Sequence, residues 1–214
     1  DLIVSRGLGD VYKRQRQTER KFMITLIVGL GNPGTKYKGT RHNVGAQFVE
    51  LLADNLKIQL KTEAKFYGQT GKANVDGKEL WLLNPNTFMN ESGKSVAAFH
   101  NFYKLDPLSI LVVHDDLDIP SGIARYKSDG GHGGHNGLRD IISSLGNKTS
   151  FKRLRIGIGH PGDSSKVTSY VLNSPLASER EEILNVFESA IETVPLLIDD
   201  QWDKALLNLH TKIR

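Results

Sequence analysis

Residues 109–118, SILVVHDDLD, decide the fold. The first half of this segment is an almost unbroken apolar run, which is typical of a strand that is buried on both faces of a sheet. Such strands belong to largely parallel sheets that helices cover on both sides. The second half is polar and follows the strand at its carboxyl end, where the ligand crevice of an open α/β sheet lies. The segment therefore predicts a central strand that carries histidine and aspartate side chains into a site.

Strand and helix patterns alternate through the rest of the chain. Residues 23–28, 122–127 and 151–160 predict strands, and residues 66–75 and 79–83 predict a hairpin around the turn Asp76-Gly77. Apolar residues at helical spacing predict helices that begin near Asn43, Ser92, Asn136, Ser178 (with Glu181 as a capping box) and Trp202, with Pro195 bending or ending the fourth. The prediction is an α/β fold, a single domain with a central, twisted, mixed (largely parallel) β-sheet flanked by helices.

Composition describes an ordinary globular protein, with 38% hydrophobic and 24% charged residues in a chain of 214. No apolar run approaches the roughly 18 residues that a membrane helix needs, so no membrane association is expected. The absence of cysteine excludes disulfides and thiolate metal sites and favours an intracellular, cytoplasmic protein.

The first 22 residues differ from the remainder in charge. They hold six Lys and Arg against three acidic residues and so carry +3 of the net charge of +4. They show neither an apolar period nor the apolar core of a signal peptide. We expect residues 1–22 to be a non-native or disordered tail before the natural start at Met23, with the domain over 23–214. A basic RNA-binding arm is the alternative. The nearly neutral remainder limits any nucleic-acid contact to a local patch.

Residues 127–137, KSDGGHGGHNG, form the most unusual loop of the chain. Five glycines let the backbone approach a ligand closely, and a helix N-terminus follows with unpaired N–H groups. Asn136 is the expected N-cap of this helix. The loop is therefore expected to hold polar groups of a substrate, with a mobile surface loop as the alternative.

Residues 29–34, GLGNPG, match the glycine pattern of dinucleotide-binding folds. Asn32-Pro33-Gly34 is a turn signal, however, and the next helical pattern begins only near Asn43. We therefore expect no nicotinamide or flavin cofactor. A serine nucleophile is also unsupported, because no G-x-S-x-G motif is present.

Polar residues at the predicted strand ends suit the activation of water. An imidazole such as His42 can act as a base, and a carboxylate such as Asp115 can orient it. Asn32, Asn90 and Asn136 add neutral amides that could position a carbonyl and its tetrahedral intermediate. Spacing alone does not pair a base with an acid 73 residues away, and a structural role for His42 stays open.

A metal site is the rival chemistry. His132, His135, His114 and Asp115 offer nitrogen and oxygen ligands. His132 and His135 lie in a flexible loop, however, and not on a helix face that would fix their geometry.

Basic residues gather on two strand segments that lead into the proposed site. They are Arg125, Lys127, Lys152, Arg153 and Arg155. If Arg125, Lys127 and Arg155 share a face, they form a phosphate clamp; otherwise they are the solvated side chains of edge strands.

Several motifs run in order from Met23 to the C-terminal helix: VGLGNPG (28–34), Tyr37, TRHN (40–43), TFMN (87–90), HDDLD (114–118), the glycine loop (130–137) and residues 153–162. Together these motifs resemble those of bacterial peptidyl-tRNA hydrolases. Asp116 departs from the glutamate expected in many relatives. The resemblance implies a monomeric α/β enzyme without metal or organic cofactor. Such an enzyme hydrolyses the ester that joins a peptide to the 3′ ribose of tRNA, which frees the tRNA for translation.

The resemblance also assigns roles. It implies that His42 is the general base, that Asp115 orients it, and that Asn32 contacts the peptide. It implies that Lys127 and Arg155 hold the tRNA 5′-phosphate. The remaining residues expected around the tRNA acceptor stem, its 3′ CCA end and the peptide are Tyr37, Phe88, Met89, Asn90, His135 and Asn136.

Two other functions remain open at this stage. A non-catalytic RNA-binding relative would lack the base and the asparagines, which this chain has. A metal-dependent amidohydrolase would be sensitive to chelators. The composition of residues 128–146 also makes a lid motion plausible.

Overall fold

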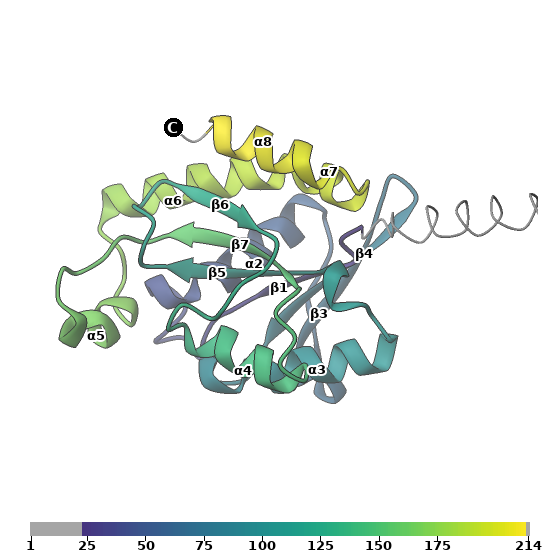
Figure 1. The fold of residues 1–214 in the computed structure, drawn as a ribbon, viewed down its shortest axis with the longest axis horizontal. Coiled ribbons are helices and arrows are strands. Elements are labelled where there is room, and N and C mark those ends of the chain that lie inside the picture. The colour runs from purple at the N-terminus through teal and green to yellow at the C-terminus, as the bar shows by residue number, and fades with distance from the viewer. Residues whose placement is uncertain (1–22, 213–214) are drawn as a thin grey trace, which may run out of the picture.

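The apolar run folds as strand β5 (Ile110–Asp116) inside the sheet of a computed structural model that describes residues 23–212 (Figure 1). Leu111 and Val113 belong to the core on one face of the sheet, whereas Ile110 and Val112 belong to the core on the other. All four side chains are fully buried, which confirms the expected central strand. The predicted tail, residues 1–22, lies outside the described residues.

The sheet has seven strands in the order β2-β3-β4-β1-β5-β7-β6. Their bounds are β1 (Leu26–Gly29), β2 (Lys61–Glu63), β3 (Gly68–Val75), β4 (Lys78–Pro85), β6 (Ala124–Lys127) and β7 (Lys152–Gly157). The central strands β4, β1, β5 and β7 run parallel, and β2, β3 and β6 add antiparallel pairs at the two edges. The prediction of a mixed, largely parallel sheet is confirmed.

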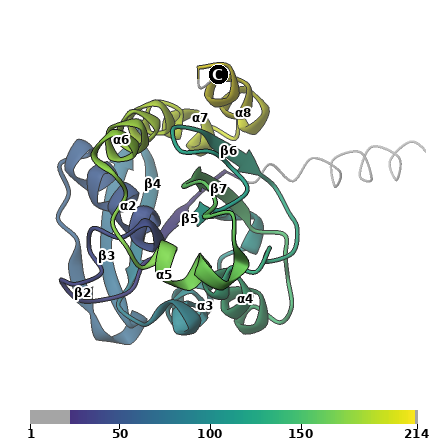
Figure 2. The same ribbon diagram turned by 90° about the vertical axis from the view of Figure 1, so that its left-hand side faces the viewer.

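Helices cover both faces of the sheet. One layer contains α2 (Val44–Asn55), α6 (Ala177–Ile191), α7 (Val194–Ile198) and α8 (Trp202–Lys212), and the other contains α3 (Ser92–Tyr103) and α4 (Asn136–Ser144) (Figure 1). The short helix α5 (Val167–Val171) lies in front of the sheet when it is viewed from the carboxyl ends of the parallel strands (Figure 2). Short 3₁₀ turns are η1 (Arg41–Asn43), η2 (Ala64–Phe66), η3 (Met89–Glu91), η4 (Pro107–Ser109) and η5 (Ser164–Lys166). No helix among residues 23–212 is long and apolar enough to cross a membrane.

The first strand begins later than predicted. The pattern predicts residues 23–28, whereas β1 covers Leu26–Gly29. The N–H of Ile24 donates to the carbonyl of Leu197 in α7, at 3.0 Å, and not to a neighbouring strand. A tertiary contact that the sequence pattern does not contain therefore shifts this boundary.

Two helix caps also differ from prediction. His135, and not Asn136, caps α4, because its Nδ1 accepts a hydrogen bond from the N–H of Leu138 at 3.3 Å. Helix α6 begins before the expected capping box. Glu179 accepts from the N–H of Leu176 at 2.8 Å and so satisfies the first turn of this helix.

Two predicted chain reversals are confirmed. Asp76 and Gly77 connect β3 to β4, both with positive φ (51° and 82°), as a two-residue hairpin turn requires. Helix α6 ends at Ile191, and Pro195 lies in the first turn of α7, where its missing N–H costs no hydrogen bond.

Candidate active site

The carboxyl ends of the parallel strands open into a cavity of about 820 Å³. Helix α5 and the glycine loop complete its walls through Val167, Val171 and residues 131–136. All of the predicted site residues line this cavity except Tyr37: Asn32, His42, Phe88, Met89, Asn90, Asp115, Lys127, His135, Asn136 and Arg155. Strand ends that lie far apart in the sequence therefore meet here, as the fold class predicts.

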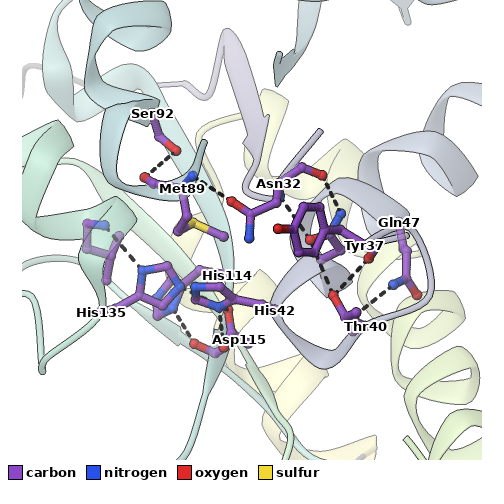
Figure 3. A network of polar contacts seen from close by, with 12 residues as sticks. Asn32, Tyr37, Thr40, His42, Gln47, Met89, Ser92, His114, Asp115 and His135 are labelled. Carbon is purple, nitrogen blue, oxygen red and sulfur yellow. Dashed lines mark hydrogen bonds and ion pairs between the residues drawn. The ribbon is translucent and has the colours of Figure 1, made fainter. Parts of the chain in front are cut away.

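His42 lies in η1 and contacts Asp115, near the end of β5 (Figure 3). Its Nδ1 lies 2.9 Å from both carboxylate oxygens of Asp115. An ionised carboxylate only accepts hydrogen bonds, so Nδ1 carries the proton in the neutral ring. The lone pair is then on Nε2. The side chain of His42 is 12% exposed and lines the cavity, which leaves Nε2 able to accept a proton there.

Asp115 accepts from a second imidazole as well. Nε2 of His135 lies 2.9 Å from Oδ1 of Asp115 and must be the donor (Figure 3). Nδ1 of His135 is then the acceptor, in agreement with its hydrogen bond from the N–H of Leu138. Both nitrogens of His135 are occupied, whereas His42 keeps one nitrogen for chemistry.

The buried charge of Asp115 sets the basicity of His42. Burial alone would raise the pKa of Asp115, but His42, His135 and their hydrogen bonds hold this pKa well below its ordinary value. Burial alone would lower the pKa of His42, but the Asp115 charge and hydrogen bond raise it above 6.5. The pair therefore combines a carboxylate that stays ionised with an imidazole whose basicity that carboxylate increases.

His114 is a third, purely neutral imidazole beside the site. Its Nδ1 lies 2.7 Å from the carbonyl oxygen of Asp115, and its ring packs against the edge of His135 with 5.1 Å between centroids. Burial and the neighbouring His135 lower the pKa of His114 to about 3. His114 is therefore neutral at pH 7 and adds no charge to the site.

Asn32 joins two of the loops that follow strands. Its Oδ1 accepts from the N–H of Met89 at 2.8 Å, and its own backbone exchanges two 2.9 Å hydrogen bonds with the side-chain amide of Asn43. This arrangement fixes the loop after β1 and leaves Nδ2 of Asn32 without a partner among the described residues (Figure 3). The free donor suits a carbonyl or a developing oxyanion.

The other predicted contact residues are more exposed. Phe88 is 54% exposed at the cavity, and Asn90 follows it in η3. Asn136 is exposed, and its Oδ1 accepts from Arg139 at 2.8 Å. Tyr37 lies outside the cavity lining, and its carbonyl accepts from Thr40 (Figure 3).

Arg153 fixes the glycine loop. Its guanidinium donates to the carbonyl of Gly131 at 2.6 Å and to the carbonyl of Gly130, although the residue is only 2% exposed. Gly130, Gly133 and Gly134 have positive φ, a conformation that favours glycine. Arg153 of β7 therefore holds the loop in one conformation, in which His135 contacts Asp115.

The sheet register places the expected cations on one face. Arg125 pairs with Arg155, and Lys127 pairs with Arg153, in the antiparallel ladder of β6 and β7. Lys127, Arg153 and Arg155 line the cavity, whereas Arg125 does not. Nε of Arg155 pairs with Asp116 at 2.7 Å, which orients the rest of the guanidinium. Two of the three cations of the expected clamp therefore reach the cavity.

The histidines of the rival metal site take part in local hydrogen bonds. Nδ1 of His132 accepts from the N–H of Gly134, and Nδ1 of His114 donates to the carbonyl of Asp115. Ligand atoms of His42, Asp115 and His135 do lie within 4.8 Å of one another. In the neutral rings the two imidazole nitrogens that face Asp115 donate to it, and each would have to lose its proton to bind a metal ion.

Sequence reasoning missed Arg41, which precedes His42. Its guanidinium is buried, pairs with Glu179 at 2.7 Å and donates to the carbonyls of Tyr170, Asn173 and Ser174. These bonds hold the chain around α5 against η1. The available signal was a charged residue between Thr40 and His42, but its partners are more than 120 residues away.

Comparisons with known proteins identify the family of this chain. The sequence model of the family described as peptidyl-tRNA hydrolase matches residues 26–214. The crystal structure of peptidyl-tRNA hydrolase from Acinetobacter baumannii is 46% identical, with a TM-score of 0.85 over 87% of this chain and 94% of that one. An arginine-to-glutamine variant of the Acinetobacter enzyme is 45% identical, with a TM-score of 0.86 over 90% and 97% of the two chains. The fold and the resemblance are confirmed: this chain belongs to the peptidyl-tRNA hydrolase family.

Proposed function

We propose that this protein hydrolyses the ester bond of peptidyl-tRNA and so releases the peptide and the free tRNA. The observation that carries the proposal is the His42–Asp115 pair, whose Nδ1 contacts leave Nε2 as a base in a cavity rich in amides. Membership of the family, an ester hydrolase family, supports the same reaction.

His42 acts on water in this proposal. Nε2 takes a proton from a water molecule as its oxygen attacks the ester carbonyl carbon, and Asp115 stabilises the imidazolium that forms. The tetrahedral intermediate then breaks its bond to the 3′ oxygen of the ribose. His42 returns the proton to this oxygen. The products are a carboxylic acid and a tRNA with a free hydroxyl, and no metal or organic cofactor takes part.

The amides of the site hold the substrate during this reaction. Nδ2 of Asn32 donates to a carbonyl of the peptide, because its Oδ1 is already bound to Met89. Asn90 in η3 and Asn136 at the start of α4 lie on two elements that pack against each other, and both side chains offer further donors and acceptors. Phe88 and Met89 supply apolar contacts. Neutral amides suit a neutral ester carbonyl, whereas positively charged side chains in their place would favour binding of free carboxylates.

Lys127 and Arg155 hold the 5′-phosphate of the acceptor stem. Both line the cavity and belong to β6 and β7, which lie on the other side of β5 from β1. The cytoplasmic location and the monomeric state remain predictions from the sequence.

The decisive experiment measures release of N-acetyl amino acid from N-acetyl-aminoacyl-tRNA in the presence of EDTA. The parent should cleave this ester rapidly, and His42→Ala should lose several orders of magnitude in kcat while tRNA binding is retained. His100→Ala is the matched control, because His100 lies in α3 outside the cavity lining. Retained tRNA binding without cleavage by the parent would favour a binding module, and loss of activity with EDTA would favour a metal enzyme.

A further inference from the structure

A second cavity, of about 280 Å³, lies beside the main one, on the α2 face of the sheet. Asn32, in the loop after β1, lines both cavities. Side-chain amides dominate the second cavity: Asn32, Asn43, Gln47, Gln69, Asn84 and Asn86. No role follows for it from the hydrolysis of the ester itself.

Three of these amides form a fixed frame. Asn43 is bound to the backbone of Asn32, the amide of Gln47 donates to the carbonyls of Lys38 and Thr40, and that of Asn84 donates to Ala46. These bonds hold the loop after β1 against α2 and the end of β4. The shape of the cavity therefore does not depend on a ligand.

Two other amides are available to a ligand. Gln69 and Asn86 are exposed, and their side chains make no hydrogen bond with another described residue. Gln69 pairs with Asn84 across β3 and β4, and the backbone of Asn86 donates to Tyr67, so both side chains sit on a rigid hairpin end. The ionic groups of the lining, Lys38 and Glu50, face each other at 3.8 Å.

We infer that this second cavity binds the backbone of the peptide, two or more residues upstream of the esterified amino acid. A peptide unit carries one N–H donor and one carbonyl acceptor, which neutral Gln and Asn side chains match without regard to sequence. Because Lys38 is paired with Glu50, the lining has no net charge and suits a neutral peptide better than a phosphate.

The order of the strands gives the direction. This step rests on the proposed function. Lys127 and Arg155 place the tRNA end over β6 and β7, and Asp115 and Asn32 place the ester over β5 and β1. The next strands in the sheet are β4 and β3, which carry Asn84, Asn86 and Gln69. A substrate that lies along the carboxyl ends of the strands, from β6 toward β3, therefore brings its peptide to the second cavity. On the way the peptide passes Asn32, whose side chain is hydrogen-bonded to Met89.

The test compares two substrates that end in the same amino acid. One carries a single N-acetylated residue, and the other carries an N-acetylated pentapeptide. Gln69→Ala combined with Asn86→Ala should raise KM for the pentapeptidyl-tRNA several-fold and change KM for the short substrate less than about twofold. Gln59→Ala combined with Gln201→Ala is the control, because these exposed amides lie outside both cavity linings.

Equal effects of the double variant on the two substrates, or no effect on either, would overturn this inference while leaving the hydrolase intact. Failure of the parent to cleave the short substrate would instead overturn the proposed function. A photoreactive benzoylphenylalanine at the third residue from the ester gives an independent readout. Crosslinks to residues 33–35 or 84–86 are expected, whereas crosslinks confined to Phe88 and α3 would place the peptide on the opposite face and exclude the second cavity.

Discussion

Asp115 accepts hydrogen bonds from two imidazoles, and this shared acceptor decides which ring can act as a base. His135 donates through Nε2 and uses Nδ1 to cap α4, so neither of its nitrogens is free. His42 donates through Nδ1 alone. A neutral His42 with its lone pair on Nε2 is therefore the arrangement that satisfies every contact of Asp115, and this favours His42 over His135 as the base.

Asp115→Asn should leave the protein folded but lower kcat by about 10³–10⁴-fold, because an amide no longer selects the reactive tautomer of His42. The pH dependence should change as well. The base works in its neutral form, so kcat/KM rises with pH through the pKa of His42, which Asp115 raises above 6.5. In the variant this midpoint should move to lower pH. Rates on N-acetyl-aminoacyl-tRNA between about pH 5 and 9 measure both effects.

Asp54→Asn is the control for this prediction, because Asp54 is an exposed carboxylate on α2. It should leave both kcat and the midpoint unchanged. A parent-like midpoint in Asp115→Asn, with circular dichroism showing an intact fold, would contradict the pairing.

The sequence predicts the place of a site residue correctly when that residue directly follows a strand. Asn32 and Asp115 follow apolar runs, and the fold class alone brings such positions to one edge. The contact of His42 with Asp115 was not deducible from spacing, because it depends on how η1 folds across 73 residues. Arg153 was grouped with the surface cations, since its burial becomes evident only when the glycine loop covers it.

At the scale of elements, the glycine loop and α4 act together. Glycine loses more conformational freedom on ordering than other residues do, so a loop with five glycines needs strong contacts to keep one shape. Arg153 supplies two of them from β7, and His135 supplies a third through Asp115. The sequence predicts Asn136 as the N-cap of α4, but His135 is the cap. The hydrogen bond from Nε2 of His135 to Asp115 orients the ring so that its Nδ1 accepts from the N–H of Leu138.

Arg153→Met should loosen this loop without unfolding the sheet. Removing the guanidinium leaves the carbonyls of Gly130 and Gly131 to water and costs about 1–3 kcal/mol of stability. Amide hydrogen exchange of residues 130–137 should become faster, and kcat/KM should fall about tenfold or more, since His135 and Asn136 lose their support.

Lys152→Met tests whether the effect belongs to the loop. Lys152 is the neighbouring cation of β7, but its Nζ lies over the ring of Trp202, on the opposite face of the sheet. This variant should keep the exchange rates of the loop unchanged. Equal acceleration in both variants would mean that β7 itself is destabilised, and the anchoring role of Arg153 would be wrong.

Across the whole molecule, charge is local. Residues 1–22 carry most of the net charge, and the remaining chain is nearly neutral. Within the sheet, Arg125, Lys127, Arg153 and Arg155 share one face at the β6–β7 edge, but Arg153 is committed to the glycine loop. We expect an enzyme built in this way to bind the tRNA at one point of the acceptor stem, so that binding depends on few phosphates.

Lys127→Gln combined with Arg155→Gln should therefore mainly raise KM for peptidyl-tRNA. Each phosphate contact contributes about 0.7–0.9 to the slope of log KM against log salt, and the two cations share one phosphate, so this slope should fall by about 0.7–0.9. Lys72→Gln combined with Lys78→Gln removes the same charge from the β3–β4 hairpin and should leave the slope unchanged. Small N-acetyl-aminoacyl-adenosine substrates, which lack the 5′-phosphate, should be insensitive to the first pair of substitutions. If these small substrates suffered as much as peptidyl-tRNA, the two cations would act on the reaction centre, and the phosphate clamp would be wrong.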